Sequence, residues 1–295
     1  MHIVGNLPCT PFNKDIDADQ TLCTNFSELC NSYFQRPASG TFLIPIEIYE
    51  SLFRKFERGK QHDAEECILF ILDNLVESFS IRDKFLILQH STVQCLKCNI
   101  KSNTKVEDLM LQLSIKPSLA QSLETFVGKE TLSDDYEYFC SHCNSKQLAS
   151  KLIKFKLSCS FCYSNPCMFF ILDTAKQIEI TETSEVLIVT LKRFRCDGKF
   201  EKIHSLVDFP LTDFLPYPSA EKYDLFCVVN HIGKRRSNSG HYNIYMNLKS
   251  LSGDNCQWYI ADDRSVTLTT QKEIVSEKAY ILFYRRQVIH CTTSL

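Results

Sequence analysis

The chain has 295 residues, of which 44% are hydrophobic, 23% charged and 12% aromatic, and its formal net charge is -2. This composition excludes a disordered or collagen-like chain, and the near-neutral charge argues against a broad nucleic-acid surface, which would cluster Lys and Arg. The longest apolar runs, such as residues 167–172, fall far short of the roughly 20 residues that cross a bilayer. We therefore expect neither nucleic acid nor a membrane as a partner.

The N-terminal part of the chain has the pattern of helices. Residues 26–34 place apolar groups at helical spacing, and residues 63–79 carry the clearest stripe, in which apolar residues recur at i, i+3, i+4 and i+7. Asp63 and Glu66 form an Asp-x-x-Glu start that resembles a capping box. We expect this helix to begin at Asp63.

After residue 85 the pattern changes to that of strands. Residues 118–127 are the exception and predict a short helix. Strands are predicted at residues 85–90, 108–115, 186–194, 223–229, 242–247, 258–261 and 279–284. Helices followed by an antiparallel sheet predict the α+β class.

Two Cys-x-x-Cys pairs, Cys95 with Cys98 and Cys140 with Cys143, predict a metal site in this chain of 15 cysteines. Two such pairs beside strands can place four thiolates tetrahedrally around Zn²⁺, and a structural zinc contributes directly to folding. Four reduced cysteines in tight turns are the alternative. An odd cysteine count without a secretory signal does not suit a disulfide scaffold, so we expect a cytoplasmic or nuclear location.

Several ordered segments carry a second pattern. Residues 59–73 read GKQHDAEECILFILD, 187–194 LIVTLKRF, 230–233 NHIG, 239–242 SGHY, 258–266 WYIADDRSV and 279–284 AYILFY. In this order they resemble the Gln-Asp-Ala box, the Leu-Lys-Arg-Phe signature, the histidine box, the acidic-residue box and the final strand of ubiquitin-specific proteases. The resemblance covers about residues 20–285, and together the ordered motifs are far more specific than any one of them.

The resemblance implies a papain-like cysteine protease fold of the ubiquitin-specific type, α+β, with a helical thumb, a β-sheet palm and zinc-ribbon fingers. It predicts a single domain over residues 1–290. The thumb is expected at 1–84, the fingers mainly at 85–185 and the palm at 186–290, with an insertion near 150–175. The implied partner is ubiquitin or a ubiquitinated protein, and the implied cofactor is structural Zn²⁺ on the four cysteines.

A cysteine protease needs a thiolate, a His that takes its proton and a group that orients that His. His241 follows a glycine and precedes a strand, and Asp262 lies on the next strand-like segment, so a hairpin would bring the two together. We expect His241 to act as the base and Asp262 to orient it. The resemblance also implies that Gln61 and Asp63 line the channel for the ubiquitin tail, although an N-cap role explains Asp63 equally well.

Cys9 is the candidate nucleophile. The family places its nucleophile in Gly-Asn-Thr-Cys-Tyr-x-Asn-Ser, whereas residues 5–12 read GNLPCTPF. There is one extra residue before Cys9, and the positions after it do not hold the aromatic residue, Asn and Ser of the family pattern. On another register these residues resemble a segment downstream of the nucleophile, so we expect the chain to be N-terminally incomplete. An oxyanion donor is worth about 10²–10³ in rate. Loss of this donor, the Asn of the family pattern, together with the nucleophile predicts a deubiquitinase domain that is inactive as given. A catalytically dead ubiquitin-binding pseudoprotease is the alternative.

Overall fold

The computed structural model describes residues 18–35, 45–128, 130–132, 138–147, 149–157, 184–196, 200–216, 221–233, 240–249 and 256–287. The chain divides into two compact units, Met1–Arg82 and Asp83–Leu295. Among the described helices, none has the length and apolar character needed to cross a membrane.

The first unit is helical, as the sequence predicts. It holds α1 (Ala18–Phe34), α2 (Ile46–Leu52) and α3 (Ala64–Ser78), and the short 3-10 helix η1 (Arg82–Lys84) follows. Asp63 is the N-cap of α3, and its side chain accepts a hydrogen bond from the backbone N–H of Glu65 at 2.7 Å. The predicted start of this helix is therefore confirmed. The Cys23 thiol on α1 donates to the Ser78 hydroxyl at 3.0 Å and ties α1 to the end of α3.

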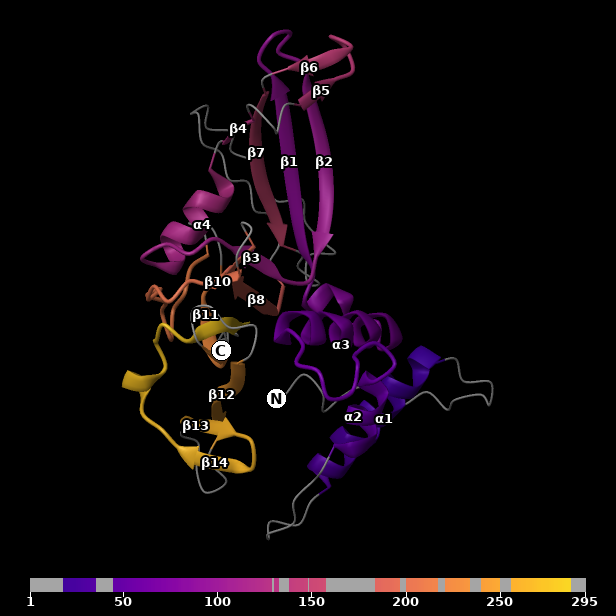
Figure 1. Ribbon diagram of the computed structural model, residues 1–295, viewed down its shortest axis with the longest axis vertical. Helices are drawn as coiled ribbons and strands as arrows, with labels where there is room; N and C mark the ends of the chain where they lie inside the picture. The colour runs from indigo at the N-terminus through magenta and orange to yellow at the C-terminus, as the bar shows by residue number, and fades with distance from the viewer. Residues whose placement is uncertain are drawn as a thin grey trace, which may run out of the picture. The chain divides into compact units, whose positions relative to one another are not determined.

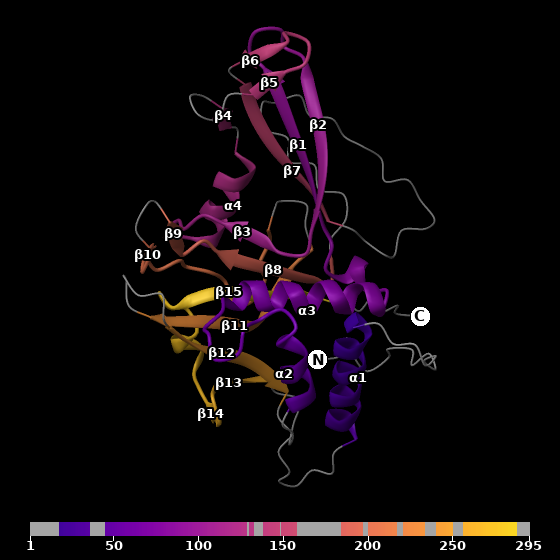
Figure 2. The ribbon, with the colours of Figure 1, turned by 45° about the vertical axis from the view of Figure 1, so that its right-hand side comes forward.

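The second unit contains a four-stranded sheet with the strand order β2-β1-β7-β4. Its strands are β1 (Ile87–Cys95), β2 (Lys101–Asp108), β4 (Glu130–Leu132) and β7 (Ala149–Leu157). A small hairpin of β5 (Tyr138–Cys140) and β6 (Ser145–Gln147) lies at the end of this sheet where β1 turns into β2 (Figures 1 and 2). This arrangement brings the two Cys-x-x-Cys pairs to the same end.

Strand β7 contains the first residues of the insertion predicted near residues 150–175. It pairs antiparallel with β1 along nine register positions, from Ile87 opposite Leu157 to Cys95 opposite Ala149. It also pairs with β4 on its other side. Residues 149–157 are thus a central strand of the four-stranded sheet, and the insertion itself stays a prediction. The remainder, from residue 158, lies outside the described residues.

A seven-stranded sheet forms the rest of the second unit, with the order β14-β13-β12-β11-β15-β8-β3. Its strands are β3 (Leu111–Leu113), β8 (Val186–Leu191), β11 (Tyr223–Gly233), β12 (Gly240–Lys249), β13 (Cys256–Asp262), β14 (Ser265–Leu268) and β15 (Ala279–Arg286). The sheet is antiparallel as expected except at one pair, since β3 runs parallel to β8. A parallel pair needs a long crossover, and the chain between these two strands supplies it.

The core of this unit gathers on β8, β11 and β15 and under α4 (Leu119–Val127). Every residue of β8 is buried, which explains the apolar run from Val186 to Val189, because a strand covered on both faces needs no polar alternation. Leu119 and Leu123 of α4 are buried in the same cluster. A short hairpin of β9 (Phe194–Cys196) and β10 (Phe200–Lys202) and the 3-10 helix η3 (Gln271–Glu273) complete the described elements.

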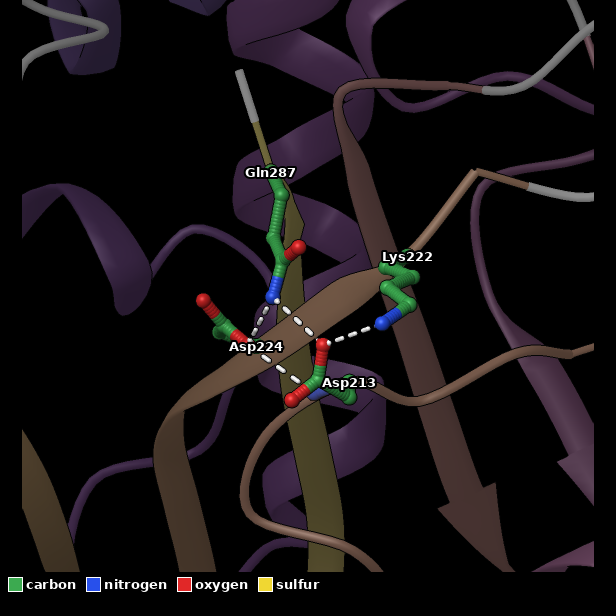
Figure 3. A network of polar contacts seen from close by, with 4 residues as sticks. All are labelled: Asp213, Lys222, Asp224 and Gln287. Atoms are coloured by element: carbon green, nitrogen blue, oxygen red, sulfur yellow. Dashed lines mark hydrogen bonds and ion pairs between the residues drawn. The ribbon is translucent and has the colours of Figure 1, made fainter. Parts of the chain in front are cut away.

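The end of β15 is held by a polar network (Figure 3). The Gln287 side-chain amide donates to Asp224 at 2.8 Å and to Asp213 at 3.4 Å, and Lys222 donates to Asp213 at 2.8 Å. The backbone N–H of Asp213, a residue with a positive φ of 55°, donates to the Asp224 carboxylate at 3.1 Å. The network joins the tight turn at Asp213 to the start of β11 and the residue that follows β15.

Candidate functional site

His241 and Asp262 meet on two neighbouring strands. His241 is the second residue of β12, and Asp262 is the last residue of β13, which pairs antiparallel with β12. Nε2 of His241 lies 2.5 Å from Oδ1 of Asp262. Both side chains remain accessible, with 43% and 40% of their surface exposed. The structure therefore brings together the two residues that the sequence pairs as base and orienting carboxylate.

The contact shifts the protonation of both groups. The hydrogen bond to Asp262 raises the pKa of His241 above its ordinary value of 6.5, and the negative charges of Asp262 and Asp263 act in the same direction. The hydrogen bond from His241, followed by one from Asn243, lowers the pKa of Asp262. Because Nε2 faces the carboxylate, the second ring nitrogen, Nδ1, faces away from it and is the one that could exchange a proton with a thiol.

A tight turn ends β13 at Asp262. Asp262 pairs with Ser265 of β14, and Asp263, the first residue of the loop between them, has a φ of 49°. Asp tolerates this left-handed conformation better than most residues. Asp263 thus belongs to the turn, whereas Asp262 is still part of strand β13, next to β12.

The glycine before His241 has a steric reason. A Cβ at Gly240 would lie 2.0 Å from Nε2 of His231, a distance that no real pair of atoms tolerates. His231 is buried on β11, and its ring contacts the rings of Phe194 and Tyr242 at centroid distances of 5.0 and 4.9 Å. Its backbone carbonyl accepts from the buried ammonium group of Lys202 at 2.6 Å. The position of the His231 ring therefore requires a glycine directly before His241.

Two buried amides lie beside the pair and were missed by the sequence prediction. Asn243, two residues after His241 on the same face of β12, donates through Nδ2 to Oδ2 of Asp262 at 3.3 Å. Asn230 of β11, the register partner of Asn243, donates through Nδ2 to Oδ1 of Asn243 at 3.0 Å. The spacing of two residues from His241 could have placed Asn243 on the same face, but it could not reveal the contact.

The four predicted cysteine ligands form one cluster. The sulfurs of Cys95, Cys98, Cys140 and Cys143 all lie within 4.8 Å of one another. The Sγ–Sγ distances are 4.0 Å between Cys95 and Cys143 and 3.6 Å between Cys98 and Cys140. Tetrahedral Zn²⁺ with Zn–S bonds of about 2.3 Å requires sulfurs roughly 3.8 Å apart. The donor set and its spacing fit a metal ion of this kind.

The two Cys-x-x-Cys turns have the same local geometry. Each is followed by an Asn in the left-handed region, Asn99 with a φ of 60° and Asn144 with a φ of 51°. Backbone N–H groups, first that of Cys98, lower the pKa of Cys95 to about 7, whereas burial raises the pKa of Cys143 to about 12. The Cys95 thiol thus ionises readily without a metal ion, whereas the Cys143 thiol would need the positive charge of a bound cation to ionise.

Comparison with known proteins decides the family. The family model described as "Ubiquitin carboxyl-terminal hydrolase" matches residues 8–284. The chain belongs to this family. Ubiquitin carboxyl-terminal hydrolase 17-like protein 10 of Homo sapiens is 30% identical over 317 residues, which cover 96% of this chain and 53% of that protein. Ubiquitin carboxyl-terminal hydrolase 16 of Arabidopsis thaliana is 30% identical over 256 residues, which cover 77% of this chain and 22% of that protein. The chain spans about half of these relatives' length or less.

A solved structure shares the fold of this ubiquitin carboxyl-terminal hydrolase family member. It is described as the SAGA Ubp8/Sgf11/Sus1/Sgf73 DUB module bound to ubiquitin aldehyde. The match has a TM-score of 0.68 with 22% sequence identity, and it covers 93% of this chain and 61% of that chain. The predicted α+β fold of the ubiquitin-specific protease type is therefore confirmed.

The other predicted site residues are Gln61, Asp63 and Cys9. Gln61 and Asp63 belong to the first unit, just before α3, where Asp63 performs the N-cap role described above. Their role in binding a ubiquitin tail stays a prediction. Cys9, the candidate nucleophile, lies outside the described residues.

Proposed function

We propose that this chain is a ubiquitin-specific cysteine protease domain in which His241 and Asp262 form the acid–base half of the site. The bond to be hydrolysed is the peptide or isopeptide bond after the C-terminal glycine of ubiquitin. The observation that carries the proposal is the 2.5 Å contact between Nε2 of His241 and Oδ1 of Asp262, in a chain that belongs to the ubiquitin carboxyl-terminal hydrolase family.

The geometry supports a defined order of proton transfers. Nδ1 of His241 would take the proton of a cysteine thiol, and the thiolate would attack the carbonyl carbon of the terminal glycine. The imidazolium, stabilised by Asp262, would return this proton to the leaving amine, and water would then hydrolyse the acyl-enzyme with His241 again as base. The raised pKa of His241 favours the imidazolium in this cycle.

We further propose that residues 1–295 alone do not catalyse this reaction. Their nucleophile candidate is Cys9, and the positions after Cys9 do not hold the aromatic residue, Asn and Ser that follow the nucleophile in the family pattern. The same feature favours a second candidate function. In that case the chain is a catalytically dead module that binds ubiquitin or ubiquitinated proteins, with Gln61 and Asp63 on the channel for the ubiquitin tail.

A ubiquitin probe with a C-terminal electrophile tests these proposals. We expect the purified chain to bind ubiquitin and to leave the probe unreacted. Covalent labelling that disappears in Cys9→Ala would overturn the proposed inactivity and identify Cys9 as the nucleophile. A folded, metal-loaded chain that does not bind ubiquitin would overturn both candidate functions. Asp262→Asn serves as the matched variant, because it should spare binding while it removes the charge that holds His241.

We also propose that the four-cysteine cluster holds a structural Zn²⁺. Cys95, Cys98, Cys140 and Cys143 would bind it, and when bound the ion supplies a crosslink between two turns, with no part in the reaction. Four thiolates require a reducing environment, which supports the cytoplasm or nucleus as the location of the chain. Metal analysis of the purified protein tests the first point, and fractionation of cells tests the second.

A further inference from the structure

Three polar side chains form a continuous row across three strands of the seven-stranded sheet. Asn230 stands on β11, Asn243 on β12 and Asp262 at the end of β13. The row runs from Nδ2 of Asn230 to Oδ1 of Asn243 at 3.0 Å, and from Nδ2 of Asn243 to Oδ2 of Asp262 at 3.3 Å. His241 contacts the other carboxylate oxygen, Oδ1. The two oxygens of Asp262 are thus engaged by two different side chains of the same strand.

Chemistry fixes the direction of these hydrogen bonds. An ionised carboxylate can only accept, so the amide of Asn243 must turn its NH₂ group toward Asp262. Its carbonyl oxygen then faces Asn230, and this oxygen can only accept, so Asn230 must present its own NH₂ group. One carboxylate therefore determines the orientation of two successive amides, and a flip of either amide would set two like groups against each other.

Burial separates the amides from the pair that they support. Asn230 is 1% exposed and Asn243 is 7% exposed, whereas the side chains of Asp262 and His241 are 40% and 43% exposed. An exposed ion pair restrains its two side chains weakly, because water competes for each of them. A buried amide has no such competition, and losing its partner would leave a polar group buried without a hydrogen bond, which is unfavourable. Asn230 is therefore the most buried end of the row, and Asp262 is the exposed end, next to His241.

From this arrangement we infer that Asn243 is a positioning residue, which holds the carboxylate of Asp262 toward His241, and that Asn230 holds Asn243 in turn. Asn243 lies two residues from His241 on β12. The amide that holds the Asp262 carboxylate and the imidazole that this carboxylate contacts are therefore carried by the same strand. The catalytic meaning of the inference rests on the proposed function of His241 and Asp262. The positioning itself does not, since it can be measured without any reaction.

The test follows the ring of His241 by NMR during a pH titration of the full chain. The carboxylates of Asp262 and Asp263 are the charges that act on this ring. Asp262→Asn removes the negative charge of Asp262 and so gives the pKa of His241 without that charge. In Asn243→Leu we expect the pKa of His241 to fall part of the way toward 6.5, because the released carboxylate turns into solvent for part of the time. An unchanged pKa in Asn243→Leu would overturn the inference.

Asn247→Leu is the matched control. It changes the same residue type on the same strand and face, four positions further along, where Asn247 pairs with Trp258 away from the His241–Asp262 contact. We expect it to leave the titration of His241 unchanged; a fall equal to that of Asn243→Leu would show a general effect of the strand and overturn the inference.

Asn230→Leu is the second variant and covers the case in which Asn243→Leu does not fold. It keeps the donor on Asp262 but removes the anchor behind it, so we expect a smaller fall in the pKa of His241. No fall in this variant would contradict the role of Asn230. Because no readout depends on a nucleophile, a chain that fails to bind ubiquitin would refute the proposed function and still report on the positioning.

Discussion

The two main sheets of the second unit are stabilised by different means. In the seven-stranded sheet, all positions of β8 are buried, and the core cluster includes Val189 of β8 and Tyr284 of β15. In the four-stranded sheet, β2 is exposed along nearly its whole length, and β1 is buried only at its two ends. Ile87, at one end of β1, belongs to the apolar core, while Cys95, at the other end, belongs to the cysteine cluster.

This difference shows what the cysteine cluster replaces. An apolar core stabilises a sheet through buried area, which the far end of β1 and β2 lacks. A metal ion held by the four sulfurs, as proposed above, would provide a local crosslink at that end instead. The four-stranded sheet should therefore depend on metal, and the seven-stranded sheet should not.

Loss of a metal ion from the proposed site is the largest expected effect. Binding of structural zinc contributes roughly 10–16 kcal/mol in zinc-finger peptides. In Cys98→Ser, or after chelation, we expect β5, β6 and the Cys95 end of β1 to lose amide-exchange protection while β8 and β15 keep theirs. Hydrogen exchange with mass spectrometry measures this difference. Cys256→Ser, an exposed cysteine outside the cluster, is the control. Equal loss of protection in both sheets would show that they do not differ in this way.

Replacing Arg193 is the corresponding test of the seven-stranded sheet. Arg193 is fully buried and donates to the backbone carbonyls of Ala279, Ile203 and Ser205 at 2.5, 3.0 and 2.9 Å. In Arg193→Met each carbonyl loses its charged donor at roughly 1–3 kcal/mol, so we expect a loss of at least about 3 kcal/mol in the free energy of unfolding.

Urea denaturation followed by the fluorescence of the single tryptophan, the buried Trp258 of β13, measures this loss. Lys192→Met, at the exposed neighbouring position, should leave the transition unchanged. A variant of Arg193 as stable as the parent would contradict the structural role of this buried guanidinium.

Gly240→Ala should have the next largest effect. The added methyl group would meet the ring of His231, and overpacking of this kind costs about 1–3 kcal/mol. A double-mutant cycle isolates the cause, since His231→Ala removes the atoms that clash. In that background we expect Gly240→Ala to cost much less. An equal cost in both backgrounds would place the strain elsewhere in β12.

Much of this site could be predicted because the signals are local. The helical stripe of residues 63–79, the two Cys-x-x-Cys pairs and the Gly-His and Asp-Asp motifs each lie within a few residues of sequence. Antiparallel neighbours then bring His241 and Asp262 together with little ambiguity. Because each motif constrains its own chemistry, these residues are recognisable before the fold is known.

The rest depends on partners that are distant in sequence. Strand β7 is defined by its pairing with β1, and nothing within residues 149–157 reveals that partner. Arg193 resembles a surface residue in sequence, yet its donors satisfy three carbonyls in two separate segments. Asn243 is an ordinary strand residue until Asp262 and Asn230 lie on either side of it. Sequence patterns report faces and spacings, whereas these three roles are set by tertiary contacts.

The His241–Asp262 pair should make stability depend on pH in a defined window. The pKa of His241 is raised, so its contribution is complete below 6.5 and is lost as the pH rises through the folded-state value. The pKa of Asp262 is lowered, so its contribution is present above 3.8 and is lost as the pH falls through its folded-state value. The difference in melting temperature between the parent and Asp262→Asn should therefore be largest between these two values. Asp263→Asn is the control and should change the profile less, and a difference that grows above pH 8 would contradict the assignment.

Lys222→Ala should have the smallest effect, because its ion pair with Asp213 is exposed. Exposed pairs of this kind often contribute nothing measurable, and salt screens what remains. The network in Figure 3 also keeps its other donors, since Gln287 still bridges Asp213 and Asp224. We expect the melting temperature of Lys222→Ala to match the parent at 0.15 M salt, roughly physiological ionic strength, and Gln287→Ala to lower it, because that variant leaves two carboxylates side by side without their shared donor. A larger loss in Lys222→Ala than in Gln287→Ala would mean that the charge, and not the bridging amide, holds the end of β15.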